Sequence, residues 1–190
     1  ADKRMKKLDK LISEDLLEPE YYGEKFLVTE LKRGGVDFAV SVPCKLTSGL
    51  ISCLEQDKDI THLSVTREEE GVGICAGVHL SGSLPCMVIQ NSGLGNSINA
   101  LASLTMLYSL PLVMLISHRG TPGEKIAAQF PMGQYSKGLL DVLNIPSFTM
   151  KDKKDVEAEL CNIVSYSRSM EFPVTVLLDF QFWSNINETV

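Results

Sequence analysis

Residues that could carry chemistry gather in four short segments, each of which follows an apolar stretch. They are Val42–Lys45 (VPCK), Thr66–Gly71 (TREEEG), Gln90–Asn96 (QNSGLGN) and Ser117–Gly120 (SHRG). Carboxyl and imidazole groups can move protons, and backbone amides next to glycines can approach a flat or anionic ligand. We therefore expect any chemistry of this chain to lie in these segments.

Strand-like and helix-like patterns alternate along the chain and would position these segments. The strand candidates are Asp37–Val42, His62–Thr66, Pro85–Gln90, Pro111–Ser117, Ser147–Met150 and Val174–Asp179. The helix candidates are Tyr22–Lys32, Leu46–Glu55, Glu69–Leu80, Gly95–Tyr108, Gly133–Leu143 and Asp155–Ser169. Several strands are continuous apolar runs, which are typical of parallel strands covered on both faces. This alternation predicts an α/β fold with an open, mostly parallel six-stranded sheet and helices on both faces.

In such a sheet, ligands bind outside the carboxyl ends of the strands. The four segments are strand exits, so the fold would bring them to one edge. The stretch from His118 to Met132 is long, polar and contains Gly and Pro, and loops of that length in compact domains are usually functional or mobile.

Length and composition are those of one globular domain. We expect a tail or helix over residues 1–20, followed by a single domain over residues 21–190. The formal net charge of -6 argues against nucleic acid or an anionic membrane as a partner. The longest apolar run, Leu110–Ile116, is too short to span a bilayer, and the N-terminus lacks the apolar stretch of a signal peptide, so a cytoplasmic location is expected.

The five cysteines are scattered and form no C-x-x-C pair, so no metal site is expected and the thiols should be reduced and mostly in the core. The histidines differ in context. His62 and His79 lie in apolar patterns that favour packing, whereas His118 follows a strand beside Arg119 and is a candidate site residue.

We compared the glycine segment Gln90–Asn96 with two known motifs, and it matches neither of them. A dinucleotide fingerprint would need a third glycine where Ile98 stands, and the next strand ends at Ser117 without an acid for the ribose. A nucleophile elbow would need glycine where Gln90 stands. The segment therefore predicts a tight glycine turn beside a ligand.

The acidic run Glu68–Glu70 has a structural explanation for part of its length. Thr66 followed by Glu69 fits a helix capping box, and acids in a first helical turn complement the helix dipole. These effects account for Glu69 and Glu70 and leave Glu68 open as a functional carboxylate.

Taken in order, the strand exits resemble the pyrimidine-binding (PYR) domain of thiamine-diphosphate-dependent 2-oxoacid decarboxylases. In that family a glutamate precedes a glycine by nine residues, as Glu68 precedes Gly77, although Cys75-Ala76 shifts the small residue by one place. Ser92–Asn96 is similar to the family's S-G-x-G segment. VPCKL, RGTPG (Arg119–Gly123) and QFPMG (Gln129–Gly133) resemble the phosphonopyruvate and sulfopyruvate decarboxylases.

The resemblance implies a fold, a cofactor and a partner. The cofactor would be thiamine diphosphate, bound here at its pyrimidine end. The family's G-D-G…N-N motif, which holds Mg²⁺ and the diphosphate, does not occur in this sequence. A separate diphosphate-binding beta subunit would then supply it, as in the split sulfopyruvate decarboxylases, and the chain would also self-associate within a hetero-oligomer.

The resemblance also implies roles for individual residues. Glu68 would be catalytic and hydrogen-bond the aminopyrimidine ring. The other residues expected at the cofactor are Pro43, Ser92, Gly93 and Asn96, and those expected at the substrate are Lys45, Asn91, His118, Arg119 and Gln129. The reaction would convert 3-sulfopyruvate to sulfoacetaldehyde and CO₂ on the route to coenzyme M. A related 2-oxoacid such as phosphonopyruvate, or a non-catalytic partner subunit, are the alternatives.

Overall fold

The structure is a computed structural model that describes residues 21–187. The expected tail over residues 1–20 and the last three residues of the expected domain lie outside this range. The strands are β1 (Phe38–Ser41), β2 (Thr61–Ser64), β3 (Pro85–Gln90), β4 (Leu112–Ser117), β5 (Ser147–Met150) and β6 (Pro173–Leu178). The helices are α2 (Tyr22–Gly34), α3 (Ser48–Gln56), α4 (Glu68–Leu80), α5 (Asn91–Ala100), α6 (Phe130–Val142), α7 (Lys153–Asp155), α8 (Cys161–Met170) and α9 (Phe180–Asn185). Short helical segments are η2 (Lys45–Thr47), η3 (Leu101–Met106), η4 (Ala127–Gln129) and η5 (Val156–Leu160).

The six strands form one sheet in the order β2-β1-β3-β4-β6-β5, and every pairing is parallel. The prediction of an open, mostly parallel six-stranded sheet is therefore confirmed. The chain proceeds from β1 to one side with β2 and to the other side with β3, which makes the gap between β1 and β3 a topological switch point. Open α/β sheets bind ligands at such a point, outside the carboxyl ends of the strands.

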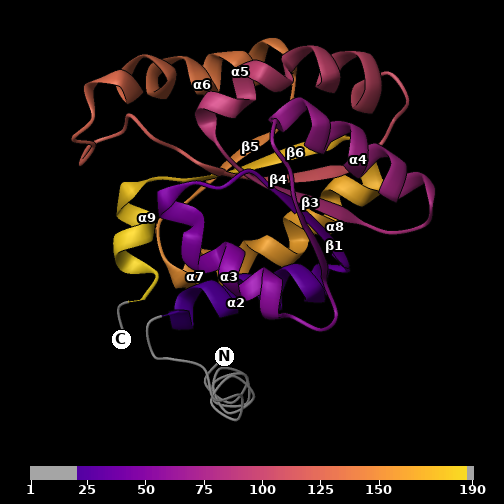
Figure 1. Ribbon diagram of the computed structural model, residues 1–190, viewed down its shortest axis with the longest axis horizontal. Coiled ribbons are helices and arrows are strands. Elements are labelled where there is room, and N and C mark those ends of the chain that lie inside the picture. Colours follow the sequence, from indigo (N-terminus) through magenta and orange to yellow (C-terminus); the bar gives the residue numbers. More distant parts are fainter. Residues whose placement is uncertain (1–20, 188–190) are drawn as a thin grey trace.

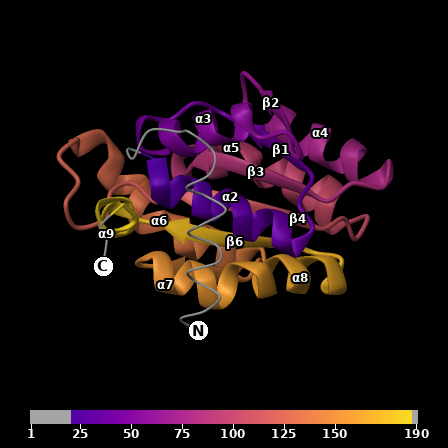
Figure 2. The same ribbon diagram turned by 90° about the horizontal axis from the view of Figure 1, so that it is seen from below.

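Helices cover both faces of the sheet, and each face has its own apolar core. Figure 1 shows α4, α5 and α6 above the sheet and α2, α3, α7 and α8 below it. Seen from below, α2 runs between α3 and α8 (Figure 2), with Phe26 of α2 fully buried. The core on that face also contains Leu50 and Val164, whereas Val72 and Leu94 belong to the core on the opposite face.

The central strands have the burial expected of strands covered on both sides, since every residue of β4 and β6 is buried. This explains their unbroken apolar sequences, because alternation is needed only when one face meets water. Three of the five cysteines, Cys53, Cys75 and Cys86, are likewise buried, and all five are free thiols.

Several helices differ from the prediction. The helix expected over Gly95–Tyr108 begins earlier, at Asn91, and changes to π-helical hydrogen bonding over Leu101–Met106. A short helix that the periodicity did not predict, α9, follows β6; the Asp179 side chain accepts the backbone N–H of Phe182 and caps its start.

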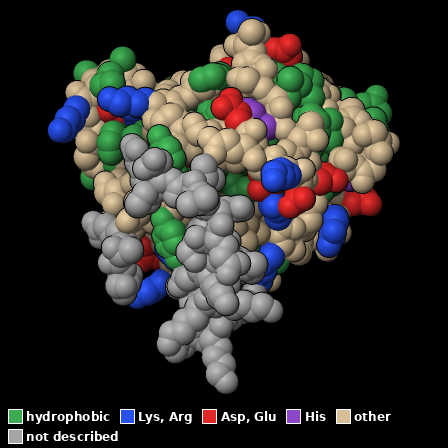
Figure 3. Space-filling view, turned by 60° about the horizontal axis from the view of Figure 1, so that its bottom comes forward, with side chains coloured by type: hydrophobic (Ala, Val, Ile, Leu, Met, Phe, Trp, Pro, Cys, Tyr) green, Lys and Arg blue, Asp and Glu red, His purple; other side chains and the backbone are tan. Residues whose placement is uncertain are grey.

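The carboxyl ends of the strands lie on the left in Figure 1, where the loop after β4 and helix α9 are found. On the face shown in Figure 3, acidic and basic side chains are interspersed. None of the helices within residues 21–187 combines the length and apolarity that a bilayer crossing requires.

Candidate active site at the carboxyl edge of the sheet

The Glu68 side chain opens helix α4 and is held in place by helix α5. Arg67 is extended (φ -141°, ψ 145°), so the chain turns sharply into the helix and Glu68 becomes its first residue. Nδ2 of Asn96 donates a 2.9 Å hydrogen bond to Oε2 of Glu68. Within the part of the chain that the structure describes, Oε1 has no hydrogen-bond partner. One carboxylate oxygen is thus fixed and the other is left for a ligand.

Gly93 makes room for the Glu68 side chain. A Cβ atom at position 93 would lie 2.2 Å from Cγ and 2.3 Å from Cδ and Oε1 of Glu68. The expected glycine turn is wrong, because Ser92–Asn96 forms the first turns of α5 and Gly93 is helical. The glycine is required by close packing of a side chain rather than by a left-handed backbone.

The remaining acids of the run stabilise the start of the helix, with one exchange of roles. Oε2 of Glu70, and not Glu69, accepts hydrogen bonds from the backbone N and Oγ1 of Thr66, at 3.2 and 3.0 Å. The N-cap of the helix is Arg67, one residue after Thr66, so the third position of the helix falls on Glu70 and not on Glu69. Glu69 instead pairs with Nε of Arg67 at 2.5 Å. Hydrogen bonds from its own backbone N–H and from Arg67 lower the pKa of Glu69.

Gln90, the last residue of β3, connects the exits of β1 and β3 with the short helical segment η4. Its Nε2 donates to Oγ of Ser92 at 2.8 Å and to Oε1 of Gln129 at 2.9 Å. Its Oε1 faces Sγ of Cys44, which follows β1, at 3.5 Å. Gln129 and Ser92, both expected at the site, are therefore brought together by a residue that was not among the expected ones.

Asn91 was expected to face the substrate, but its side chain is fully buried and its amide is occupied by protein groups. Nδ2 donates to the carbonyl of Arg119 and to Oγ of Ser136, both at 3.0 Å. Oδ1 accepts the backbone N–H of Arg119 at 3.1 Å. Asn91 thus fixes the chain after β4 instead of presenting a free amide.

Arg119 was expected to offer its charge to the substrate, but that charge is engaged within the protein. Its Nε and Nη2 donate to the two carboxylate oxygens of Glu124 at 2.6 and 2.9 Å, a bidentate pair in which the Glu124 side chain is 1% exposed. The guanidinium also lies 5.3 Å from the ring centre of Phe180. The hydrogen bond from Arg119, followed by three backbone N–H groups, lowers the pKa of Glu124 to about 2.

His118 is also turned into the protein, with an exposed fraction of 7%. Its Nε2 lies 3.0 Å from the carbonyl oxygen of Gly133, and its backbone N–H binds the carbonyl of Leu178. A protonated Nε2 that donates to this carbonyl leaves Nδ1 as the acceptor. The ring links β4 to the start of α6 and is not a free group at the edge.

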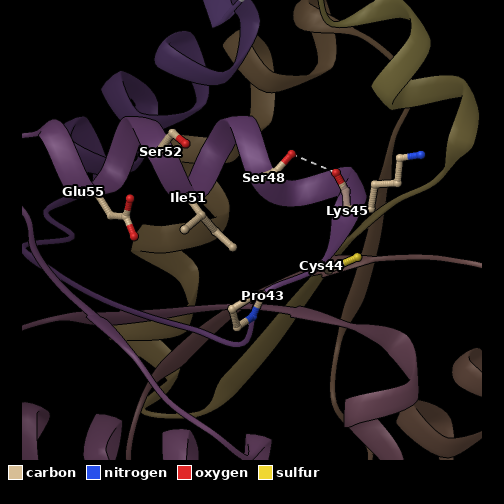
Figure 4. Close-up of a pocket in the computed structure, with 7 residues that line it drawn as sticks. All are labelled: Pro43, Cys44, Lys45, Ser48, Ile51, Ser52 and Glu55. Carbon is tan, nitrogen blue, oxygen red and sulfur yellow. Dashed lines mark hydrogen bonds between the residues drawn. The ribbon is translucent and has the colours of Figure 1, made fainter.

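Lys45 is an exposed cation at the edge. It opens η2 after β1, and its side chain points away from Pro43 in Figure 4. Within residues 21–187 its ammonium group makes no ion pair. An open pocket of about 440 Å³ lies beside it, lined by Pro43, Cys44, Lys45, Ser48, Ile51, Ser52 and Glu55. Glu68 does not line this pocket, so the carboxylate and the hollow are separate parts of the edge.

Among the expected residues, Glu68, Gly93 and Asn96 form one cluster and Ser92 and Gln129 a second one. Gln90 and Glu124 were not expected. Gln90 occupies a strand exit, which is a signal that sequence reading can use, whereas Glu124 lies in a loop without any periodic pattern. Within the described residues, no group of three or more His, Cys, Asp or Glu side chains is arranged to hold a metal ion.

Comparison with known proteins assigns residues 22–143 to the family described as "Thiamine pyrophosphate enzyme, N-terminal TPP binding domain". The chain is 47% identical to the sulfopyruvate decarboxylase subunit alpha of Methanococcus maripaludis, over 80% of this chain and 90% of that protein. It is 41% identical to the subunit alpha of Methanocaldococcus jannaschii, over 85% of this chain and 95% of that protein. A phosphonopyruvate decarboxylase of Streptomyces viridochromogenes is 37% identical over 70% of this chain, which spans 34% of that protein.

Among solved structures, a 2-oxoglutarate:ferredoxin oxidoreductase from Magnetococcus marinus has a similar fold. The TM-score is 0.67 at 14% identity, over 86% of this chain and 29% of that one. This likeness concerns the fold alone.

Proposed function

The chain belongs to the family of N-terminal thiamine-pyrophosphate-binding domains of thiamine pyrophosphate enzymes, and from this premise we propose that it is the alpha subunit of a sulfopyruvate decarboxylase. It would bind the pyrimidine end of thiamine diphosphate and act in the conversion of 3-sulfopyruvate to sulfoacetaldehyde and CO₂. The single observation that carries this proposal is the Glu68 carboxylate, with one oxygen held by Asn96 and the other open beside Gly93. The similarity to subunits alpha from several archaea supports the choice of substrate.

The residues around Glu68 fit the proposed cofactor. A ring nitrogen needs a carboxyl group that can share a proton with it, and Oε1 of Glu68 is available for that bond. Gly93 lets the Glu68 side chain lie directly against helix α5, because the position has no room for a Cβ atom. Asn96 orients the carboxylate, and Ser92 and Pro43 border the same edge.

Thiamine diphosphate, when bound, supplies the electron sink that decarboxylation of a 2-oxoacid requires. The part of this chain is to hold and move a proton at Oε1 of Glu68. Asn96 keeps the other oxygen from rotating away, so the geometry is set before the ligand arrives. Such positioned acid–base groups contribute roughly 100- to 10,000-fold to a rate.

The sulfonate of the substrate is a second fixed anion, and we assign it to Lys45. An anion that is removed from water must be paired with a cation. Arg119 is the rival, but both of its chelating N–H groups are used by Glu124, and it is 7% exposed. Lys45 is exposed at the β1 exit, next to the switch point, and its four-carbon stem can reach a substrate held above the edge.

The diphosphate and Mg²⁺ would be held by a separate beta subunit. Two features support this division. The sequence contains no Gly-Asp-Gly, and the relatives that this chain covers over 90–95% of their length are named as subunits alpha. By contrast, the chain spans 30% of the sulfopyruvate decarboxylase of Methanosarcina acetivorans, which carries no subunit designation in its name. The alpha subunit would also contact a second copy of itself within the hetero-oligomer.

A second substrate deserves a direct test because phosphonopyruvate decarboxylases are similar to this chain at 33–37% identity. A substrate panel on the reconstituted complex should give a higher kcat/KM for sulfopyruvate than for phosphonopyruvate or pyruvate. Equal or higher kcat/KM for phosphonopyruvate would reassign the substrate.

A non-catalytic role is tested by titrating thiamine diphosphate, with Mg²⁺, into the chain alone and into the complex. The proposal predicts weak binding to the chain alone and tight binding to the complex. In addition, replacement of Glu68 by Gln should weaken binding to the complex. A complex that binds cofactor equally well with Glu68→Gln would contradict the assigned role.

A further inference from the structure

The side chain of Gln90 uses its whole amide group within the protein. Its two N–H donors are directed to Ser92 and Gln129, and its carbonyl oxygen faces the thiol of Cys44. These partners come from the start of α5, from η4 and from the β1 exit, which are far apart in the sequence. The proposed chemistry has no task for Gln90 itself, so its contacts require another explanation.

The neighbouring residue, Asn91, holds the opposite end of the same loop. The loop runs from Arg119, after β4, to Gln129, before α6. Asn91 binds both the N–H and the carbonyl of Arg119, and it also binds Ser136 of α6. Two consecutive side chains at the junction of β3 and α5 therefore fasten both ends of the segment Arg119–Gln129.

The two fastenings differ in how easily they open. Asn91 is fully buried and makes three hydrogen bonds at 3.0–3.1 Å, so its release would leave several polar groups unpaired inside the protein. The backbone also brings the two ends of the segment together, since a Cβ atom on Gly120 would lie 2.3 Å from the carbonyl oxygen of Gln129. Gln90 and Gln129 are only half-buried and share one hydrogen bond, so water can replace it at lower cost.

We propose that Gln90 is a positioning residue that latches Gln129, and with it the segment Arg119–Gln129, over the carboxyl edge of the sheet. Asn91 is the fixed anchor and Gln90 the releasable latch. The Arg119–Glu124 pair stiffens the first half of the segment, and the Gln90 contact fixes the side chain of Gln129 at its other end. That Gln129 then meets the substrate rests on the proposed function; the latch itself does not.

Limited proteolysis of the full chain tests the latch. Lys125 is exposed in the middle of the segment, and trypsin cleavage after it reports how often the segment opens. Gln90→Leu and Gln129→Leu each remove the shared hydrogen bond, and we expect cleavage at Lys125 to rise about 3- to 10-fold relative to cleavage at the exposed Lys58. This ratio, measured by mass spectrometry, separates local opening from global unfolding. Unchanged ratios in both variants would overturn the proposal.

Further variants refine this test. Gln129→Glu keeps the acceptor for Nε2 of Gln90 and should be cleaved like the original chain. The double variant Gln90→Leu with Gln129→Leu should open no more than the more open single variant, because one contact is lost in all of them. Gln134→Leu, on the exposed side of α6, is the matched control and should leave the ratio unchanged. Additive effects in the double variant, or an equal rise in the control, would contradict a latch.

Kinetics of the reconstituted complex separate the latch from the proposed function. Gln90→Leu should raise the KM for sulfopyruvate, and Gln129→Leu, which also removes a substrate contact, should raise it at least as much, with the affinity for thiamine diphosphate unchanged in both. If the original complex fails to decarboxylate sulfopyruvate while the proteolysis ratios still rise, the proposed function fails and the latch stands. If the original complex is active and Gln90→Leu leaves the KM for sulfopyruvate unchanged, the positioning role is overturned.

Discussion

Nδ2 of Asn96 lies 2.9 Å from Oε2 of Glu68, and a Cβ atom on Gly93 would lie 2.2 Å from Cγ of the same glutamate. Helix α5 thus fixes one oxygen of the carboxylate and packs closely against the Glu68 side chain. Residues 25 or more positions apart in the sequence meet because α4 and α5 pack against each other on the same face of the sheet.

Replacement of Glu68 by Gln should reduce the turnover of the reconstituted complex by at least ~100-fold, because the amide cannot exchange a proton with a ring nitrogen. The fold should be retained, since the amide oxygen can still accept from Asn96. Steady-state kinetics and circular dichroism check the two parts. The control is Glu69→Gln, which should stay active. An inactive Glu69→Gln together with an active Glu68→Gln would move the catalytic role by one residue.

Gly93→Ala should impair the site while the neighbouring Gly95→Ala leaves it intact. The new methyl group at position 93 would overlap the Glu68 side chain, whereas at position 95 the nearest heavy atom is Cε of Met132 at 3.7 Å. We expect Gly93→Ala to lose roughly 10- to 100-fold in turnover, as displacement of a positioned catalytic group does. Activity assays and thermal melts of both variants decide this, and equal activity of the two would contradict the packing argument.

The Arg119–Glu124 pair predicts a particular dependence of stability on pH. The pKa of the Glu124 carboxyl in the folded protein, about 2, lies below its ordinary value of 4.5. The pair therefore contributes its full stabilisation of the fold above pH 4.5, and this stabilisation is lost as the pH falls toward 2. Glu124→Gln should lower Tm by about 3–10 °C near neutral pH. The difference from the original chain should shrink between pH 4.5 and pH 2.

Thermal melts of both proteins across this range measure that difference. Glu159→Gln, at an exposed carboxylate of η5, provides the matched control and should give no difference that varies with pH in this way. A Tm difference for Glu124→Gln that stays constant from pH 6 to pH 2.5 would contradict the assignment of the low pKa to this pair.

Lys45→Ala should raise the KM for sulfopyruvate by roughly 10- to 100-fold, the expected effect of losing one charged hydrogen bond. The affinity for thiamine diphosphate should change little. Lys58→Ala, at the other end of α3, is the matched control and should behave like the original chain. If Lys45→Ala has the same KM for sulfopyruvate as the original chain, another cation binds the sulfonate. Arg119→Ala would then be the next variant to assay.

The sequence predicts the fold well where burial decides the structure. The bounds of β3 and β5 match the prediction, because apolar runs between turn residues have few alternatives. The start of α5 was missed because Ser92, Gly93 and Gly95 are weak helix formers, and the helix forms there through its packing on Glu68. Tertiary contact overrides the local preference at this point.

The sequence predicts where the site lies better than it predicts the roles of the individual residues. The strand exits do meet at one edge, as expected of a parallel sheet. Asn91, His118 and Arg119 look like site residues in the sequence, but their side chains are engaged within the protein. The residue type alone does not reveal whether an amide side chain is buried and engaged or free to bind a ligand. The partner of Arg119, Glu124, lies in a loop where no periodic pattern indicates its role. Only the three-dimensional contacts separate these cases.

We propose that this chain is half of a split decarboxylase whose catalytic carboxylate is Glu68. The most direct measurement is steady-state CO₂ release from sulfopyruvate, with thiamine diphosphate and Mg²⁺, by this chain, by the diphosphate-binding partner, and by their mixture. We expect turnover by the mixture alone, and loss of this turnover when the chain carries Glu68→Gln. Turnover by this chain without a partner, or an undiminished rate in the mixture with Glu68→Gln, would contradict it.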